Sequence, residues 1–170
     1  MNQTCMWCSQ KIAEVSDSLE QERTSAYAVC RCCAEHVTLP PSGPLQKYLD
    51  QVNAPVLAIE LHAGHYMIIR AVNRKACEWL GKEPREIIQH LSGNVIDCAY
   101  ARLTEGCGKT LFCASCAIKQ AVVGTAKTGE PRVHARVVFS QGDPDHPSQV
   151  TLSITTLKAG NRVLLKAEIC

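Results

Sequence analysis

Residues 69–81 read Ile69-Arg70-Ala71-Val72-Asn73-Arg74-Lys75-Ala76-Cys77-Glu78-Trp79-Leu80-Gly81 and join an apolar strand to a capped helix. Asn73 is a favoured N-cap residue, because its side-chain oxygen can accept from the free amides of the first helical turn. Gly81 suits the left-handed conformation that ends many helices. This stretch therefore predicts a strand that ends at Val72 and a short helix over residues 74–80.

Alternation of apolar and polar residues predicts four further strands around this stretch. Residues 56–60 precede the turn at residues 62–65, where Gly64 can take a positive φ, and the chain returns over residues 66–72. Residues 132–140, 149–157 and 162–169 alternate in the same way near the end of the chain. A helix that begins near Pro84 is expected to bury Ile87, Ile88 and Leu91. The order of elements predicts an α+β fold.

Two strands, several short helices and three antiparallel strands is an order that resembles a PAS domain. Residues 69–81 resemble the family's second strand and asparagine-capped helix, and Thr128-Gly129-Glu130-Pro131 resembles its turn before the third strand. The resemblance covers residues 45–169. It implies a five-stranded antiparallel sheet with short helices on one face, and a cavity for a small-molecule ligand. It also implies a sensor in bacterial signal transduction that acts through a signalling protein partner or a homodimer.

Residues 95–130 contain four cysteines, Cys98, Cys107, Cys113 and Cys116, in the spacing C-x8-C-x5-C-x2-C. Thiols so closely spaced can close a tetrahedral zinc site or hold an iron–sulfur cluster. Packing as small core residues is the alternative, above all for Cys98, which follows apolar residues. The segment is similar to a cysteine-bearing PAS subgroup. Zinc and an iron–sulfur cluster both remain possible occupants of the site.

An amphipathic helix is predicted directly after this cysteine segment. Ile118, Ala121, Val122 and Thr125 recur at helical spacing, and Gly129 suits the end of the helix. Because a helix N-terminus lowers the pKa of nearby thiols, Cys113 and Cys116 are well placed as soft ligands.

The N-terminal segment carries a second set of paired cysteines. Cys5, Cys8, Cys30 and Cys33 form two C-x2-C pairs, the pattern of a four-thiolate zinc site. So short a segment has little core of its own, and metal binding would supply its folding free energy. We therefore expect a zinc-ribbon-like module over residues 1–38, a proline-rich linker over 39–44 and a PAS-like sensory domain over 45–170.

The composition indicates in which compartment the chain lies and which classes of partner it lacks. Eleven cysteines without an apolar export signal favour metal binding in a reducing cytoplasm over a disulfide framework. A net charge of +2 gives no basic surface for nucleic acid, and no apolar run is long enough to cross a membrane. The chain is expected to be cytoplasmic, with no nucleic-acid or membrane partner.

No arrangement of residues typical of an enzyme is present. The sequence shows no nucleophile placed beside a base and no phosphate-binding glycine loop, so we expect no catalytic residues. No output segment follows the last strand, so signalling is expected to pass through a partner or through self-association. An apolar stripe of Leu45, Tyr48, Leu49 and Val52 is expected to mediate a dimer or to pack on its own sheet. The alternative function is a structural adaptor with two zinc sites, which mediates protein–protein interaction and senses nothing.

Overall fold

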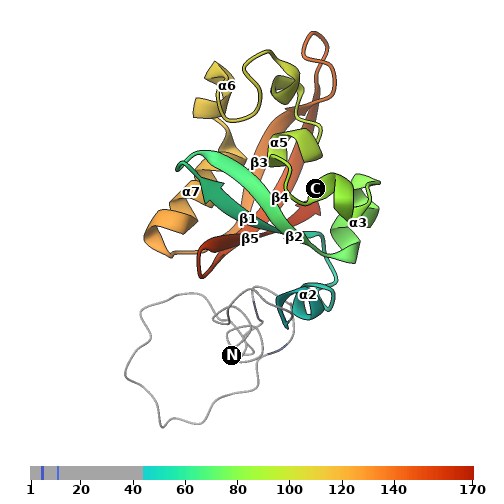
Figure 1. Cartoon of the computed structure of the whole chain (residues 1–170), viewed down its shortest axis with the longest axis vertical. Coiled ribbons are helices and arrows are strands. Elements are labelled where there is room, and N and C mark those ends of the chain that lie inside the picture. The colour runs from blue at the N-terminus through green and yellow to red at the C-terminus, as the bar shows by residue number, and fades with distance from the viewer. Residues whose placement is uncertain (1–4, 6–10, 12–43) are drawn as a thin grey trace.

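The computed structural model describes Cys5, Lys11 and residues 44–170 (Figure 1). Three of the predicted N-terminal zinc ligands, Cys8, Cys30 and Cys33, lie outside the described residues, as do residues 39–43 of the predicted linker. The elements, in chain order, are α2 (Pro44–Leu49), β1 (Val56–His62), β2 (Tyr66–Val72), α3 (Arg74–Leu80), α4 (Pro84–Ile87), α5 (Ser92–Val95), the 3-10 helix η1 (Ala99–Arg102), α6 (Leu111–Ala114), α7 (Ala117–Thr128), β3 (Arg132–Gln141), β4 (Ser148–Ala159) and β5 (Arg162–Ile169).

The strands form one antiparallel sheet in the order β2-β1-β5-β4-β3, which confirms the predicted α+β architecture. Three predicted elements have the predicted bounds: β2, α3 and β5. Asn73 caps α3, and Gly81 ends it at φ 62°. No helix in the described part of the chain is long and apolar enough to span a bilayer.

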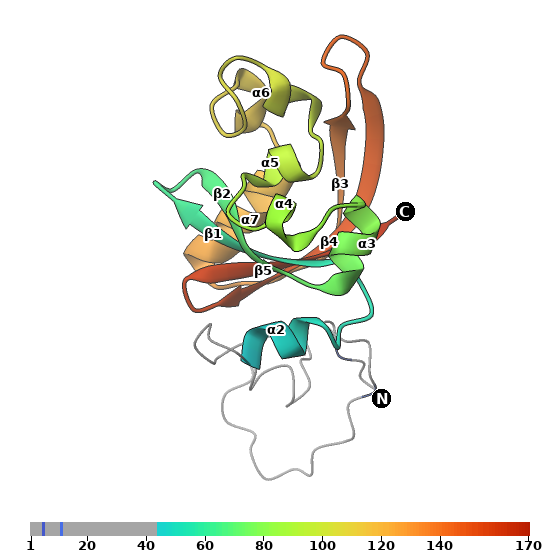
Figure 2. The same cartoon turned by 45° about the vertical axis from the view of Figure 1, so that its right-hand side comes forward.

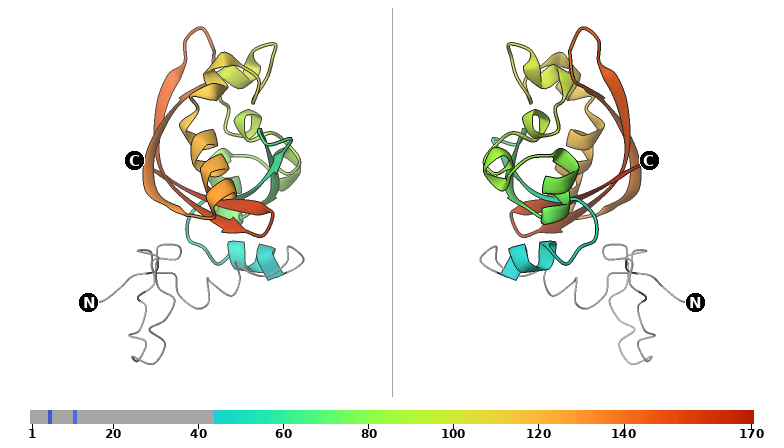
Figure 3. Two further views of the ribbon diagram at one scale, coloured as in Figure 1. Left: turned by 90° about the vertical axis from the view of Figure 1, so that its left-hand side faces the viewer. Right: turned by 90° about the vertical axis from the view of Figure 1, so that its right-hand side faces the viewer.

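The main core lies between one face of the sheet and helices α3 to α7 (Figures 2 and 3). Leu57 and Ile59 of β1 and Val163 and Leu165 of β5 point to this side. In Figure 3, α7 lies inside the curve of the sheet. Its buried residues are the four predicted from helical spacing, Ile118, Ala121, Val122 and Thr125.

The opposite face of the sheet is covered by α2 (Figure 2). Leu45, Tyr48, Leu49 and Val52 are all buried there, against Val56, Ala58 and Leu164 of the sheet and against Cys5. The apolar stripe therefore packs on its own sheet, and the expectation that it forms a dimer surface is wrong. The alternating face of β1 and β5 supplies the apolar surface that the helix needs.

Asn73 holds three segments together at the edge of this second core. Its Oδ1 accepts from the amides of Val56, at 2.9 Å, and Ala76, at 2.9 Å. Its Nδ2 donates to the carbonyls of Leu49, at 2.9 Å, and Ala54, at 2.8 Å. The side chain is fully buried. One amide group thus joins α2, the chain leading into β1, and α3.

The single helix expected over residues 84–91 is instead two short helices with an extended link. Ile88 leaves α4 at ψ 137°, and Gln89 takes φ 68°. The amide of Gln89 then donates to the carbonyl of Ile69 at 2.7 Å, and the amide of Ile69 donates to His90 at 3.0 Å. Strand β2 is the edge of the sheet, and its unpaired backbone groups compete with helical hydrogen bonds for this segment.

Candidate functional site

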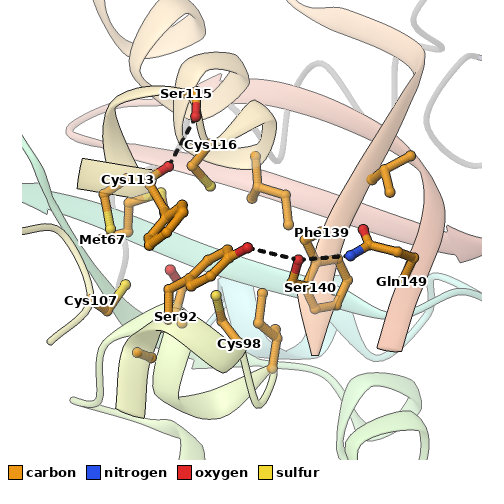
Figure 4. Close-up of a pocket in the computed structure, with 17 residues that line it drawn as sticks. Met67, Ser92, Cys98, Cys107, Cys113, Ser115, Cys116, Phe139, Ser140 and Gln149 are labelled. Carbon is orange, nitrogen blue, oxygen red and sulfur yellow. Dashed lines mark hydrogen bonds between the residues drawn. The ribbon is translucent and has the colours of Figure 1, made fainter. Parts of the chain in front are cut away.

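The predicted cysteine site lies on a cavity of about 200 Å³ between the sheet and helices α5 to α7 (Figure 4). Cys98, Cys107, Cys113 and Cys116 all line this cavity, although seventeen residues lie between the first and the last. Met67 of β2, Ile118 of α7 and Phe139 of β3 complete its apolar wall. The fold therefore brings all four predicted thiols to one cavity.

Cys107 reaches the cavity because its neighbour on α5 is a glycine. A Cβ atom built on Gly93 would collide with the Cys107 side chain, sulfur included. The pKa of the Cys107 thiol is raised to about 11, mainly by burial, with smaller contributions from the nearby thiols of Cys113, Cys98 and Cys116. The backbone amide of Gly93 acts in the opposite direction by donating toward the sulfur. Without a bound cation, Cys107 therefore stays protonated at neutral pH.

Cys116 is the N-cap residue of α7. Burial raises the pKa of its thiol, and the thiols of Cys98 and Cys113 add to the rise. The amides of Lys119 and Ile118, in the first turn of α7, lower the pKa. Amides at a helix N-terminus favour a negative charge, so this sulfur is placed to bind a cation as thiolate.

Two polar groups lie within hydrogen-bond distance of the Cys113 sulfur. The amide of Gly108 donates to its Sγ at 3.1 Å, and the Thr110 hydroxyl lies 3.1 Å from the same atom. Gly108 takes φ 96° and Gly106 takes φ 75°, so both glycines that flank Cys107 use a conformation that L side chains rarely adopt. The turn that this allows folds the segment back over the Cys113 sulfur.

Cys98 lies where α5 meets the edge of β3. Its amide donates to the carbonyl of Gly93 at 2.8 Å, and it forms an isolated antiparallel bridge with Gln141. Gly93 therefore contacts two of the four cysteines, Cys98 through its carbonyl and Cys107 through its amide. Cys98, the cysteine for which core packing is the main alternative, is held by backbone contacts with Gly93 and Gln141.

An aromatic pair shares the cavity with the thiols. The rings of Tyr100 and Phe112 are stacked, with centroids 3.8 Å apart and planes 8° apart. Ser140 of β3 donates to the Tyr100 hydroxyl at 3.3 Å, and Gln149 of β4 donates to the Ser140 hydroxyl at 2.9 Å (Figure 4). A polar chain thus runs from the cavity wall into two strands.

Metal binding by these four cysteines stays a prediction. Among Cys5, Lys11 and residues 44–170, no group of three or more His, Cys, Asp or Glu side chains could hold a metal ion as the side chains stand. Cys5, the described member of the N-terminal set, is buried against α2, where it takes part in the second core.

Two histidines and a further cysteine lie outside the cavity. His90, in the link between α4 and α5, is exposed, and its ring nitrogen lies 3.1 Å from the Ile88 carbonyl. His134 of β3 is exposed, and its Nδ1 lies 3.7 Å from a carboxylate oxygen of Glu168. Cys77 packs at the margin of the main core and is half-buried rather than enclosed.

Sequence reasoning missed three residues of the cavity. Gly93 and Tyr100 lie between predicted elements, and neither carries a motif. Ser92 is 2% exposed, lines the cavity, and has no hydrogen-bond partner for its hydroxyl in the described part of the chain. The S-G pair at Ser92-Gly93 is a turn signal, and nothing in it indicates a contact with a cysteine fourteen residues away.

Comparisons with known proteins find similar folds. No family model matches the chain, and no curated protein matches it. The structure is similar to the PAS domain of an HTR-like protein from Haloarcula marismortui, at 12% identity over 74% of this chain and 88% of that chain, with a TM-score of 0.45. It is similar to the PAS domain of nitrogen regulation protein NR(II) from Vibrio parahaemolyticus, at 13% identity over 76% of this chain and 100% of that chain, with a TM-score of 0.43.

A third similar structure is a domain of the sensory box sensor histidine kinase/response regulator from Geobacter sulfurreducens. It shares 14% identity over 73% of this chain and 90% of that chain, with a TM-score of 0.44. Sequence identities this low do not assign any ligand or activity of those proteins to this chain.

Proposed function

We propose that the chain is a cytoplasmic sensory module of the PAS type whose signal-bearing centre is a metal held by Cys98, Cys107, Cys113 and Cys116. The observation that carries this proposal is that all four thiols line one cavity. Soft thiolate ligands select zinc and iron–sulfur centres. The output is a change in the sheet, which a signalling protein or a second copy of the chain would read.

The size of the cavity favours a metal centre over an organic ligand. Pockets for drug-sized ligands enclose roughly 300–1,000 Å³, whereas this cavity encloses about 200 Å³. Four thiols on its wall also exceed the few polar groups that orient a small organic molecule. A small-molecule ligand, the expectation drawn from the PAS resemblance, is therefore the less favoured occupant.

Hydrogen bonds from the site to the sheet give the centre a route to the surface. Tyr100 is bonded to Ser140 of β3, which is bonded to Gln149 of β4. The Gln141 side chain donates to the carbonyl of Ile96 at 2.9 Å, between α5 and Cys98. A shift of the cysteine-bearing segments on metal binding would therefore alter the contacts of β3 and β4.

We further propose that Cys5, Cys8, Cys30 and Cys33 bind a structural zinc ion, separate from the sensory centre. The support is their paired spacing alone. The two sites can be distinguished by single substitutions, because each cysteine set lies in its own stretch of the chain.

Metal analysis of the full chain, purified without oxygen, tests the proposed function. Cys113→Ser should lose the centre of the cavity, while Cys8→Ser should release about one equivalent of zinc and keep that centre. Hydrogen exchange of β3 and β4 should differ between the metal-loaded and metal-stripped protein. If Cys113→Ser kept the wild-type metal content, the centre would not be at this cavity. If the cavity held zinc and exchange did not change on its removal, the structural adaptor would be the correct function.

A further inference from the structure

We infer that the cavity holds an iron–sulfur cluster, with Cys98, Cys107, Cys113 and Cys116 as its ligands and the Ser92 hydroxyl as a hydrogen-bond donor to one of its sulfides. This inference rests on the proposed function, because it identifies the metal centre of the same site. Each thiol would lose its proton to solvent on binding iron, so that four thiolates bind one cluster.

The arrangement of the four cysteines fits a cluster better than a single ion, because among the described residues no three metal-binding side chains are grouped around one ion position. Zinc bonds to sulfur are about 2.3 Å long, so four ligands of one zinc ion would lie roughly 3.5–4 Å apart, with no cavity between them. A cluster holds its thiolates roughly 6–7 Å apart around a core of iron and sulfide. The four cysteines line a cavity of about 200 Å³, which leaves room for such a core.

Ser92 provides an independent sign of an occupant. Its side chain is 2% exposed and lines the cavity, and its Oγ has no hydrogen-bond partner in the described part of the chain. In Figure 4 it lies between the sulfurs of Cys107 and Cys98. Buried hydroxyl groups are nearly always hydrogen-bonded, so an acceptor belongs in the cavity. An inorganic sulfide of a cluster is such an acceptor, and so is a metal-bound thiolate.

The groups around the thiols suit the negative charge of a thiolate-bound cluster. The Gly108 amide donates to the Cys113 sulfur at 3.1 Å, and the Thr110 hydroxyl lies 3.1 Å from it. Cys116 begins α7, a helix of twelve residues whose N-terminus favours negative charge. Hydrogen bonds to sulfur stabilise such centres and set their reduction potential.

Reconstitution of the metal-stripped full chain tests the assignment. One sample receives ferrous iron and sulfide under anaerobic, reducing conditions, and a second receives zinc alone. We expect iron and sulfide in equal amounts with broad visible absorbance, which Cys113→Ser loses and Cys8→Ser keeps. If the cavity bound zinc and rejected iron with sulfide, the cluster would be ruled out and the metal centre would stand. If it bound neither, both proposals would fall.

The role of Ser92 is tested by the reduction potential of the reconstituted protein. Ser92→Ala removes the donor, so we expect a lower potential with the iron content unchanged, because a hydrogen bond to sulfide stabilises the reduced, more negative cluster. Ser115→Ala is the matched control. Ser115 also lines the cavity, but it is exposed and its hydroxyl donates to the Phe112 carbonyl at 3.3 Å. Equal potentials in the two variants would overturn the assignment of Ser92. If Ser92→Ala did not fold, Ser92→Thr, which keeps the hydroxyl, should retain the wild-type potential, and a lowered potential there would overturn it.

Discussion

Gly93 contacts Cys107 so closely that any side chain at position 93 would occupy the place of the Cys107 side chain. The contact joins α5 to the turn that carries the second of the four cysteines. It makes Gly93 a positioning residue of the site, although it cannot itself bind metal.

Gly93→Ala should weaken metal binding at the cavity by roughly 10- to 100-fold, the range found for groups that orient metal ligands. The metal-free chain should also lose about 1–3 kcal/mol of stability, because an added methyl group overpacks this contact. Competition with a chelator measures the first effect, and denaturant unfolding measures the second.

Gly124→Ala is the control for this substitution. Gly124 lies inside α7, where a Cβ atom would meet the Arg132 side chain at an ordinary 3.6 Å. Alanine in a helix is favoured over glycine by roughly 0.5–1 kcal/mol, so the variant should be slightly more stable. Wild-type metal affinity in Gly93→Ala would show that the contact with Cys107 does not position the thiol.

Asn73→Ala should destabilise the chain by about 2–4 kcal/mol. The substitution removes the N-cap of α3, and it leaves the Val56 amide and the Leu49 and Ala54 carbonyls without the partner that Asn73 provides. Urea unfolding followed by circular dichroism measures the loss. Asn94→Ala, at an exposed position on α5, should change stability by less than about 0.5 kcal/mol. Equal losses in the two variants would contradict the role given to Asn73.

Glu83→Gln should speed the alkylation of Cys77 by about twofold, because it lowers the pKa of that thiol. Burial raises the pKa of Cys77, and the carboxylates of Glu83 and Asp50 raise it further. Removing one of these charges lowers the pKa and increases the thiolate fraction at a fixed pH. Glutamine keeps an oxygen for the capping box of α4. Peptide mass spectrometry after timed iodoacetamide treatment gives the rate.

The exposed thiol of Cys170 serves as the internal standard, and its alkylation rate should not change.

The raised pKa of Cys77 also fixes the sign of a pH effect on folding stability. The folded chain holds the Cys77 proton more tightly than the unfolded chain, so this contribution is lost as pH rises above the ordinary thiol value of 9.0. A slower Cys77 reaction in Glu83→Gln would exclude the electrostatic effect of that carboxylate.

Tyr100→Phe should uncouple the cavity from the sheet with little loss of stability, under about 1 kcal/mol. The ring can stay stacked on Phe112, but the bond from Ser140 is lost. The difference in hydrogen exchange of β3 and β4 between metal-loaded and metal-stripped protein should therefore shrink. Tyr66→Phe, on β2, removes a phenol hydroxyl elsewhere and should preserve the difference. An unchanged difference in Tyr100→Phe would place the coupling on another route.

The sequence predicted which cysteines share a cavity, and their binding of a metal stays a prediction. The cysteine spacing indicated a shared centre, and the fold does bring Cys98 and Cys116 to one cavity. The spacing left a single zinc ion and a cluster both open, because sequence distance does not fix where side chains point. Ser92 and Gly93 were missed since their roles depend on a contact between two loops.

Local patterns in the sequence determined the elements whose signals are local. The bounds of β2, α3 and β5 and the buried face of α7 follow from alternation, helical spacing and caps, which act over a few residues. Tertiary structure decided everything that depends on distant partners. The open edge of β2 turned residues 88–91 from helix to extended chain, and the outer face of the sheet buried the stripe on α2. The physical reason is the same in both cases: backbone groups and apolar surface exposed on one element are satisfied by another that is far away in sequence.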